Sequence, residues 1–318
     1  MPDELGVIRS IVGRAGELPK GFSKIGDDVA AVPQGSGKIV LKVDMLVQHT
    51  DVPPAMSYRQ AARKAVAMCV SDFAAKGVRP YAFMVSLGLV RGVGKKEVDG
   101  LALGLRDAEK EWGVLLVGGD TNEAQELVID CAMVGFAERL VPRSGARPGQ
   151  VLVVTGKFGL PPAGLRLLSG QASAASVFGQ KAKSSVLSPR PDLKVGLALA
   201  PFLSASMDSS DGLARSLHIL AAESRVGFEV TCSPAARGVQ SFAEANGVSA
   251  EELVFEGGEE YAIVGTLPRA RVSAAKAAAR RAGGELLEIG RVTRERRVVR
   301  ATGGGVRPIR DRGWTHLR

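Results

Sequence analysis

Aspartates that end apolar segments are the residues of this sequence whose type and spacing most directly suggest chemistry. They follow a glycine-rich opening or end runs such as KIVLKVD and VLLVGGD, and the set comprises Asp27, Asp28, Asp44, Asp120, Asp208 and Asp211. Ligands of α/β folds bind beside the carboxyl ends of strands, and Mg²⁺ prefers oxygen ligands of this kind. The pattern therefore predicts a site for divalent cations. Taken singly, Asp28 and Asp211 would fit a turn or a helix N-cap equally well.

Asp72 joins this set through its position on a predicted helix. Ala65, Met68 and Asp72 share one helical face at spacings of three and four, and that face is otherwise apolar. An acid near the carboxyl end of a helix is unfavourable for the helix dipole. We therefore expect a cation beside Asp72, and an exposed acid at the helix end is the simpler alternative.

The sequence lacks the signatures of several common nucleotide and metal enzymes. It contains no G-x-x-x-x-G-K-[ST], no G-x-G-x-x-G and no His-Glu-x-x-His, which disfavours P-loop enzymes, Rossmann dehydrogenases and zincins. The three histidines, His49, His218 and His316, are far apart, so a histidine metal site or a Ser-His-Asp hydrolase has little support. We expect a structural role for His218, beside the apolar face of its helix.

Alternating strands and helices must position the aspartates. Hydrophobic periodicity predicts strands over 38–43, 81–90, 114–117, 127–137, 151–155, 260–266 and 285–292. It predicts helices over 57–76, 95–112, 161–168, 194–200, 211–224 and 271–282, with Ser57 as the N-cap of the first and Gly77 as its stop. Segment 169–188 is predicted to be a polar loop, and segment 294–297 a charged hairpin turn.

The length and one turn-rich segment indicate two domains. A chain of 318 residues exceeds one ordinary domain, and Pro, Gly and Arg are concentrated in 142–150 (PRSGARPGQ). Both halves alternate helices and strands. We therefore expect an α/β (α+β) fold with a mixed sheet covered by helices in each domain, the first over residues 1–141 and the second over 142–318.

Composition and charge narrow the partners and the compartment. The chain has 42 Lys and Arg against 33 Asp and Glu, and its net charge of +9 favours nucleic acid, acidic membranes or phosphorylated small molecules. Aromatic residues make up only 5%, a poor supply for stacking bases, and no run approaches a membrane span. Three widely spaced cysteines and an amino terminus without a signal-peptide core favour a cytoplasmic protein.

Nine short segments, in this order, resemble the thiamine-monophosphate kinases, whose superfamily also contains aminoimidazole ribonucleotide synthetase. The segments are IGDDVA, DMLV, VSDFAAKG, GGDT, RSGARPG, VTG, MDSSDGL, GGEEY and GWTH, and they begin at residues 25, 44, 70, 118, 143, 154, 207, 257 and 313. They extend over essentially the whole chain. The resemblance implies the two-domain fold of that superfamily, with the nucleotide in the cleft beside the amino-terminal domain and that domain forming a homodimer.

The same resemblance implies an activity and a set of site residues. The reaction would be phosphorylation of thiamine monophosphate to thiamine pyrophosphate by direct in-line transfer from ATP, with Mg²⁺ and without a covalent phosphoenzyme. The metal ligands would be Asp27, Asp28, Asp44, Asp72, Asp120 and Asp208, of which Asp44, Asp120 and Asp208 would be catalytic. ATP would contact Gly119, Asp120, Arg143 and Ser210, and the thiamine substrate would contact Asp211, Glu259 and Trp314.

The sequence departs from the family pattern at a few positions. Lys42 and Val43 stand where threonines are common, so we expect any hydroxyl contribution to metal binding to be lost. Glu260 stands where the family has an aspartate. Without the resemblance, Trp314 would be interpreted as a core tryptophan, although its aromatic face could attract the cationic thiazolium.

Two other functions compete with this interpretation. The first keeps the fold and ATP but changes the acceptor, as in a related synthetase or a kinase of another phosphorylated metabolite. The second is a basic nucleic-acid-binding protein, motivated by the net charge and by the run RERR. That run fits a solvated turn better, so we expect no nucleic-acid partner and no membrane partner.

Overall fold

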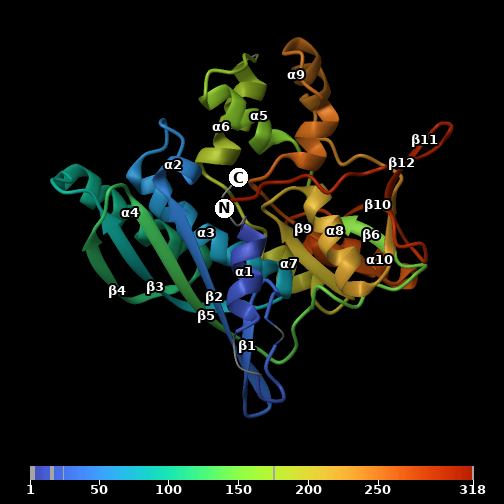
Figure 1. Cartoon of the computed structure of the whole chain (residues 1–318), viewed down its shortest axis with the longest axis horizontal. Coiled ribbons are helices and arrows are strands. Elements are labelled where there is room, and N and C mark those ends of the chain that lie inside the picture. The colour runs from blue at the N-terminus through green and yellow to red at the C-terminus, as the bar shows by residue number, and fades with distance from the viewer. Residues whose placement is uncertain (1–3, 15–17, 24, 175, 317–318) are drawn as a thin grey trace.

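Two β-sheets, one from each half of the chain, form the framework of the molecule. The computed structural model describes residues 4–14, 18–23, 25–174 and 176–316. The first sheet has five strands in the order β1-β2-β5-β3-β4, and the second has seven in the order β12-β11-β8-β10-β6-β9-β7. Figure 1 shows the first sheet on the left and the second on the right.

The first sheet is mixed and is covered on one face only. Its strands are β1 (Ala30–Gln34), β2 (Gly37–Val47), β3 (Arg79–Leu89), β4 (Leu115–Glu123) and β5 (Val128–Ala137). All neighbouring strands are antiparallel except β3 and β4. On β2, Val40 and Leu46 are fully buried against helices, whereas Leu41 and Val43 point to the other face and are exposed.

Helix α3 (Tyr58–Lys76) is the element around which both halves pack. Ser57 caps it through a complete capping box, and Gly77 ends it in the left-handed conformation, as the sequence predicts. Its residues Val66, Val70 and Phe73 belong to the core of the first sheet, together with helix α4 (Lys95–Trp112). Its last turn, Ala74 and Ala75, belongs to a core of the second half. One helix therefore joins the two sheets.

The second sheet is covered by helices on both faces. Its strands are β6 (Val151–Val154), β7 (Ala205–Ser209), β8 (Gly227–Val230), β9 (Glu260–Leu267), β10 (Leu287–Thr293), β11 (Val298–Thr302) and β12 (Gly305–Pro308), with β8 and β11 parallel. Helix α8 (Leu213–Ser224) contributes Leu213, Leu217 and Leu220 to one core. Helices α7 (Leu193–Leu199) and α10 (Val272–Arg281) contribute to the core on the other face. The predicted fold class is thus confirmed.

The remaining helices lie at the ends and edges of these layers. They are α1 (Glu4–Val12), α2 (Gln48–Asp51), α5 (Leu160–Leu168), α6 (Ser176–Leu187), α9 (Val239–Ala245), a π-helix (Glu252–Glu256) and a 3₁₀ turn (Arg269–Arg271). Helices α5, α6 and α9 gather at the top of Figure 1. No helix within the described ranges is long and apolar enough to cross a membrane.

Several sequence predictions are wrong in detail. The segment predicted to be a polar loop contains α6, because Ala182 and Val186 are fully buried against the neighbouring elements. The run 294–297 is not a hairpin turn, since β10 and β11 pair with opposite edges of β8. Asp44 and Asp120 lie inside β2 and β4 rather than at strand ends, because both strands extend further than their apolar runs.

Close packing between α3 and α4 gives a test of the first layer. A Cβ added at Gly104 would lie 2.1 Å from the Arg59 carbonyl oxygen and 2.9 Å from the Ala62 Cβ. We expect Gly104→Ala to lower the free energy of unfolding by about 1–3 kcal/mol, as overpacking of a core does. Denaturant unfolding measures this change.

Gly100, four residues earlier on α4, is the matched control. A Cβ there would have its nearest neighbours at 3.4 and 3.5 Å, which is ordinary contact. Gly100→Ala should therefore leave stability unchanged or raise it by up to about 1 kcal/mol, because alanine favours helix. Equal losses in the two variants would contradict the packing of these helices.

Candidate functional site

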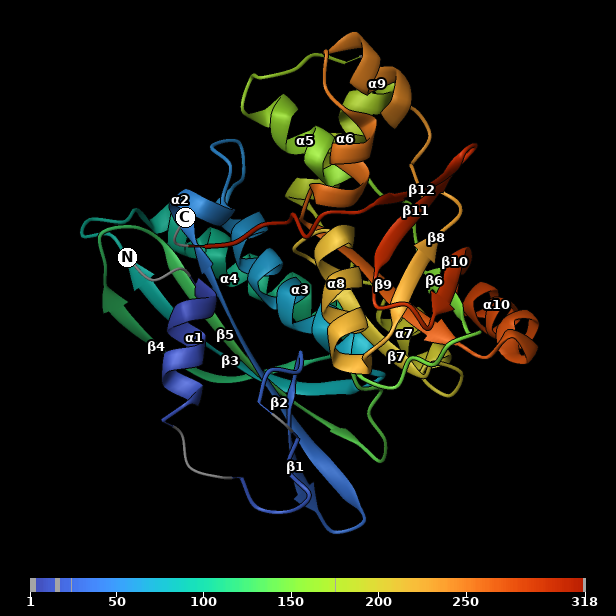
Figure 2. The ribbon, with the colours of Figure 1, turned by 45° about the vertical axis from the view of Figure 1, so that its right-hand side comes forward.

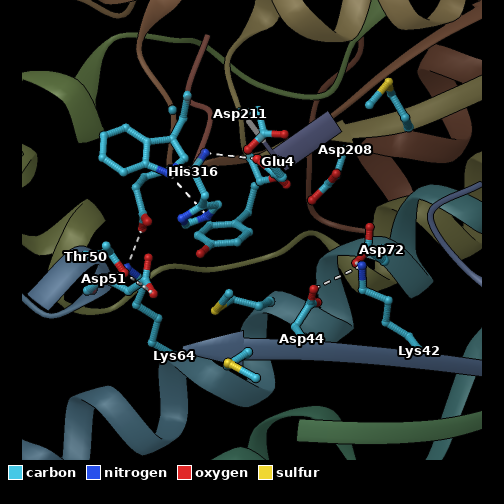
Figure 3. A pocket seen from close by; sticks show the side chains of 18 of the residues that line it. Glu4, Lys42, Asp44, Thr50, Asp51, Lys64, Asp72, Asp208, Asp211 and His316 are labelled. Atoms are coloured by element: carbon cyan, nitrogen blue, oxygen red, sulfur yellow. Dashed lines mark hydrogen bonds and ion pairs between the residues drawn. The ribbon is translucent and has the colours of Figure 1, made fainter. Parts of the chain in front are cut away.

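A pocket of about 350 Å³ lies where the two halves meet, and it is rich in charge (Figure 3). Residues of β2 and α3 line it from the first half, and residues of β7, the segments beside β7 and β9, and the carboxy-terminal tail line it from the second. Its carboxylates, within the described residues, are Glu4, Asp44, Asp51, Asp72, Asp208, Asp211 and Glu259. Its fixed cations there are Lys42, Lys64 and Arg143. The lining is therefore formally negative.

Three of the predicted metal ligands come together beside this pocket, and two of them, Asp72 and Asp208, belong to its lining. Asp28 precedes β1, Asp72 lies on α3 and Asp208 lies on β7. One carboxylate oxygen of each lies within 4.8 Å of the other two, and all three residues are buried. Three elements that are distant in sequence thus place their acids at one point, which we call the aspartate triad.

Two cations, the buried Lys76 and the half-buried Arg143, hold Asp28 and Asp27 in place. The Lys76 Nζ lies 2.7 Å from Asp27 Oδ1 and 2.6 Å from Asp28 Oδ2, and it donates a 2.6 Å hydrogen bond to the Ser206 carbonyl oxygen. Arg143 Nε donates to Asp28 Oδ1 at 2.7 Å. Burial opposes ionisation of Asp28, but Lys76 and Arg143 outweigh it and lower its pKa. Asp28 is therefore a carboxylate with a fixed position.

Lys42 is the cation beside Asp72 that the helix geometry predicts. Its Nζ lies 2.7 Å from Asp72 Oδ2 and 3.0 Å from Asp44 Oδ1 (Figure 3). Burial alone would lower the pKa of Lys42, but Asp72 and Asp44 raise it well above its ordinary value. The alternative of an exposed Asp72 is wrong, because only 6% of this residue is exposed.

The remaining two triad members hold protons more tightly than isolated carboxyls. Burial raises the pKa of Asp208 to about 7, and the nearby Asp28 adds to this effect, while a 2.7 Å hydrogen bond from Ser71 opposes it. Burial also raises the pKa of Asp72 well above its ordinary range, against the effect of Lys42. A buried carboxylate cluster binds protons when the cations around it do not balance its negative charge. Oxygen donors in such a cluster fit Mg²⁺, which would replace those protons.

Gly119 and Asp120 lie away from this pocket. The β-ladder aligns Asp44 with Cys131, Cys131 with Val85 and Val85 with Gly119. Asp44 is thus three strands from Gly119, about 14 Å at the usual strand spacing. Asp120 pairs with Ser86 on the uncovered face of the sheet, whereas Asp44 faces the helices. The structure therefore does not bring Asp120 to the triad of the same chain.

The residues predicted to contact the thiamine substrate also line this pocket. Glu259, whose backbone is in the left-handed region, pairs with the buried Lys64 at 2.7 Å, and its N–H donates to the Ser210 carbonyl oxygen. The backbone N–H of Trp314 donates to the Asp211 carbonyl oxygen. Trp314 is 51% exposed, so the interpretation as a core tryptophan is wrong.

The two ends of the chain meet at this pocket. The backbone N–H of His316 donates to Glu4 Oε2 at 2.9 Å, and both residues belong to the pocket lining. Figures 2 and 3 show α1 and the carboxy-terminal tail approaching each other there. His218, by contrast, lies outside the lining and hydrogen-bonds to the Ile309 carbonyl oxygen, which confirms its structural role.

Sequence reasoning missed the three lysines that compensate the acids. Lys64 and Lys76 are 1% exposed within α3, and Lys42 stands where the family commonly has a threonine. The alternation of side chains along β2 could have indicated Lys42, because Lys42 and Asp44 must share one face of the strand with the apolar Val40 and Leu46. A lysine two residues from an aspartate on a buried face requires a partner.

Two family models match most of the chain. The AIR synthase related protein, N-terminal domain, matches residues 26–137, and the AIR synthase related protein, C-terminal domain, matches residues 147–302. The matched segments contain the first and most of the second sheet, respectively.

Curated relatives and solved structures agree with these models. The thiamine-monophosphate kinase of Nitrosopumilus maritimus (strain SCM1) is 37% identical over 280 residues, covering 88% of this chain and 89% of that protein. That of Pyrococcus abyssi is 31% identical and covers 96% of both. A structure of AaThiL complexed with AMPPCP and TMP is 27% identical, with a TM-score of 0.86 over 99% of this chain and 97% of that one.

Glu260 is a buried acid beside the pocket whose titration can be tested. It is 5% exposed and accepts a hydrogen bond from the Gly159 N–H. Burial raises its pKa from 4.5 to about 8. The folded state therefore binds one more proton at this group than the unfolded state between about pH 4.5 and pH 8.

We expect this group to make the protein less stable as the pH rises through that window. The contribution of Glu260 to the free energy of unfolding is fully present below its unfolded pKa of 4.5. It is lost as the pH rises through its folded pKa of about 8. Its slope is at most about 1.4 kcal/mol per pH unit. Glu260→Gln should flatten the dependence, whereas the exposed Glu138→Gln should not. Thermal unfolding at pH 6 and pH 8.5 measures the pH dependence of stability in both variants. The same dependence in wild type and in Glu260→Gln would contradict a raised pKa of Glu260.

Proposed function

The chain belongs to the AIR synthase related protein family and to its thiamine-monophosphate kinases, and from this premise we propose that it phosphorylates thiamine monophosphate with ATP. The product is thiamine pyrophosphate. The observation that carries the proposal is the aspartate triad of Asp28, Asp72 and Asp208, buried at a pocket that also contains Arg143 and Trp314. A related protein of the same architecture is described in complex with AMPPCP and TMP.

The acidic end of the pocket suits the phosphates of ATP when divalent cations are bound. Asp27, Asp28, Asp44, Asp72 and Asp208 would hold Mg²⁺, which neutralises charge on the transferring phosphoryl group. Arg143, which donates to Asp28 of the triad, would contact the nucleotide together with Ser210. The protein itself then has to position the two phosphates in line, and no covalent intermediate is needed.

Other residues of the pocket lining suit a cationic ring. Asp51, Asp211 and Glu259 contribute negative charge, and Trp314 and Tyr261 contribute aromatic surface. Glu259 is already paired with Lys64, so it would position neighbouring groups more than it would balance the thiazolium charge. Asp211 is the better counter-charge, and Trp314 the better ring contact.

The two parts of the chain would have different roles in binding and catalysis. We assign metal and nucleotide binding and dimerisation to residues 1–141, and completion of the cleft to residues 142–318. Both parts contribute to the pocket lining: the proposed metal ligands Asp44 and Asp72 come from the first part, and the second part adds Asp208 together with the proposed substrate contacts Glu259 and Trp314. We propose the cytoplasm as the compartment, since ATP is the co-substrate and Cys69, Cys131 and Cys232 are free thiols.

The uncovered face of the first sheet supports a homodimer. Its exposed apolar side chains include Leu41, Val43, Tyr81, Met84 and Phe136. Contiguous exposed apolar residues on a sheet usually mark an interface. Asp120 lies on the same face, so in such a dimer it would act at the site of the partner subunit, with Gly119 beside it, rather than in the pocket of its own chain.

The alternatives differ in measurable ways. Release of ADP that requires thiamine monophosphate supports the proposal, and turnover with a different phosphorylated acceptor alone would favour the related kinase or synthetase. A nucleic-acid-binding function is less well supported, because the pocket lining is formally negative. We therefore propose neither nucleic acid nor membrane as a partner.

We expect Asp208→Asn to lower the rate of ADP release at least about 100-fold, since it removes a ligand and not only a supporting residue. The chain should stay folded, because the neutral amide resembles the protonated carboxyl that burial favours. Asp192→Asn is the control, as burial also raises the pKa of Asp192, to about 6, but it lies outside the pocket lining. Near-normal turnover by Asp208→Asn would refute the metal role.

We expect Leu41→Asp to convert a dimer of about 66 kDa, twice the 33.2 kDa chain, to a monomer. Leu41 is 42% exposed on the uncovered sheet face, and burying an unpaired charge in an interface is costly. Leu103→Asp is the control, because Leu103 is 48% exposed on α4. Light scattering after gel filtration gives both masses. A dimer in both variants would exclude this face as the interface.

A further inference from the structure

Lys42 occupies the space between two of the proposed metal ligands. Its Nζ lies 3.0 Å from Asp44 Oδ1 and 2.7 Å from Asp72 Oδ2. Asp44 lies on the same strand and Asp72 on α3, so the ammonium group joins two elements as a bound metal would. The Lys42 side chain is 20% exposed and lines the pocket.

The other two buried lysines are tied to the protein backbone. Lys76 donates to the Ser206 carbonyl oxygen, and Lys64 donates to the Asp51 carbonyl oxygen at 2.8 Å, in addition to their ion pairs. Lys76 thus connects α3 to β7. Lys76 also contacts two proposed metal ligands, Asp27 and Asp28, but its third donor is held by the β7 backbone. Lys42 directs two of its three N–H donors to Asp44 and Asp72, which would otherwise be free to bind a cation.

The charges of the cluster limit how many divalent cations it needs. Around the triad, five carboxylates face three protein cations, and the groups are Asp27, Asp28, Asp44, Asp72 and Asp208 against Lys42, Lys76 and Arg143. The formal difference is two negative charges, which one Mg²⁺ would balance. Without Lys42 the difference would be three, and Asp44 and Asp72 would both lack their cation.

A metal ion and the ammonium group cannot occupy this position together. Mg²⁺ binds carboxylate oxygens at about 2.0–2.1 Å, and it would have to approach the same two oxygens that Lys42 contacts. Like charges at such a distance also repel strongly in a buried site. The position therefore holds either Lys42 or a divalent cation.

We infer that Lys42 is a built-in cation that takes the place of one divalent metal ion between Asp44 and Asp72. This inference rests on the proposed metal-dependent function. It makes the site of this chain bind one divalent ion fewer than a site with threonine or another uncharged residue at that position. Lys42 is thus a positioning residue that holds the Asp44 and Asp72 carboxylates together before substrate arrives.

Counting bound Mn²⁺ tests the inference without reference to activity. Electron paramagnetic resonance gives the number of Mn²⁺ ions per full-length chain in wild type and in Lys42→Met, with AMPPCP present. We expect Lys42→Met to bind one more equivalent than wild type. Lys38→Met is the matched control, because Lys38 lies on the same strand and face but donates to the Gly21 carbonyl oxygen; it should give the wild-type count.

A second variant and a second measurement guard against loss of folding. Lys42→Thr should also gain one equivalent of Mn²⁺. In metal-free buffer both variants should unfold at a lower temperature than wild type, because two carboxylates lose their cation, and Mn²⁺ should raise their Tm more than that of wild type. An equal Mn²⁺-induced shift in Tm for wild type and both variants would overturn the inference.

The outcomes separate this inference from the function on which it rests. If wild type binds Mn²⁺ and transfers phosphate, but Lys42→Met and Lys42→Thr bind no additional ion, only the role of Lys42 is refuted. If wild type binds no Mn²⁺ at all in the presence of AMPPCP, the metal-dependent function fails, and the inference fails with it.

Discussion

The burial of several carboxylates at the junction of two sheets is the constraint on which the rest of this structure depends. Ionised acids cannot be removed from water without cations nearby. Lys76 and Arg143 meet this requirement for Asp27 and Asp28, and Lys42 meets it for Asp44 and Asp72. Asp208 accepts a hydrogen bond from Ser71, and burial raises its pKa to about 7. Binding of a further cation at this point is therefore favoured by the fold itself.

The same constraint explains why α3 lies between the two halves. Its carboxyl-terminal turn packs into the core of the second half, and Lys76 in that turn reaches both the acids near β1 and the backbone of β7. Asp72, one turn earlier, contributes to the triad. The helix thus contacts both sheets and also positions the proposed metal ligands, so a change in its packing would alter both.

The sequence predicted the layers better than the site. Long periodic segments such as α3 and α4 were predictable, because their apolar faces and capping residues are local signals. Helix α6 was not predictable, because its composition is largely polar. The small residues that allow α5 and α6 to pack closely are not evident from that composition. Asp28, Asp72 and Asp208 could be selected from their segments, but the exclusion of Asp120 from their cluster depends on strand order and sheet face, which the spacing of residues does not contain. Lys64 and Lys76 were missed because their partners lie on other elements.

The most direct test of the proposed function follows the γ-phosphate of ATP. The full-length chain is incubated with [γ-³²P]ATP, Mg²⁺ and thiamine monophosphate, and the labelled products are separated and quantified. The account predicts that the label appears in thiamine pyrophosphate in equal amount to the ADP formed, with none bound to the protein. Label released as inorganic phosphate, retained on the protein or transferred only to another acceptor would contradict it.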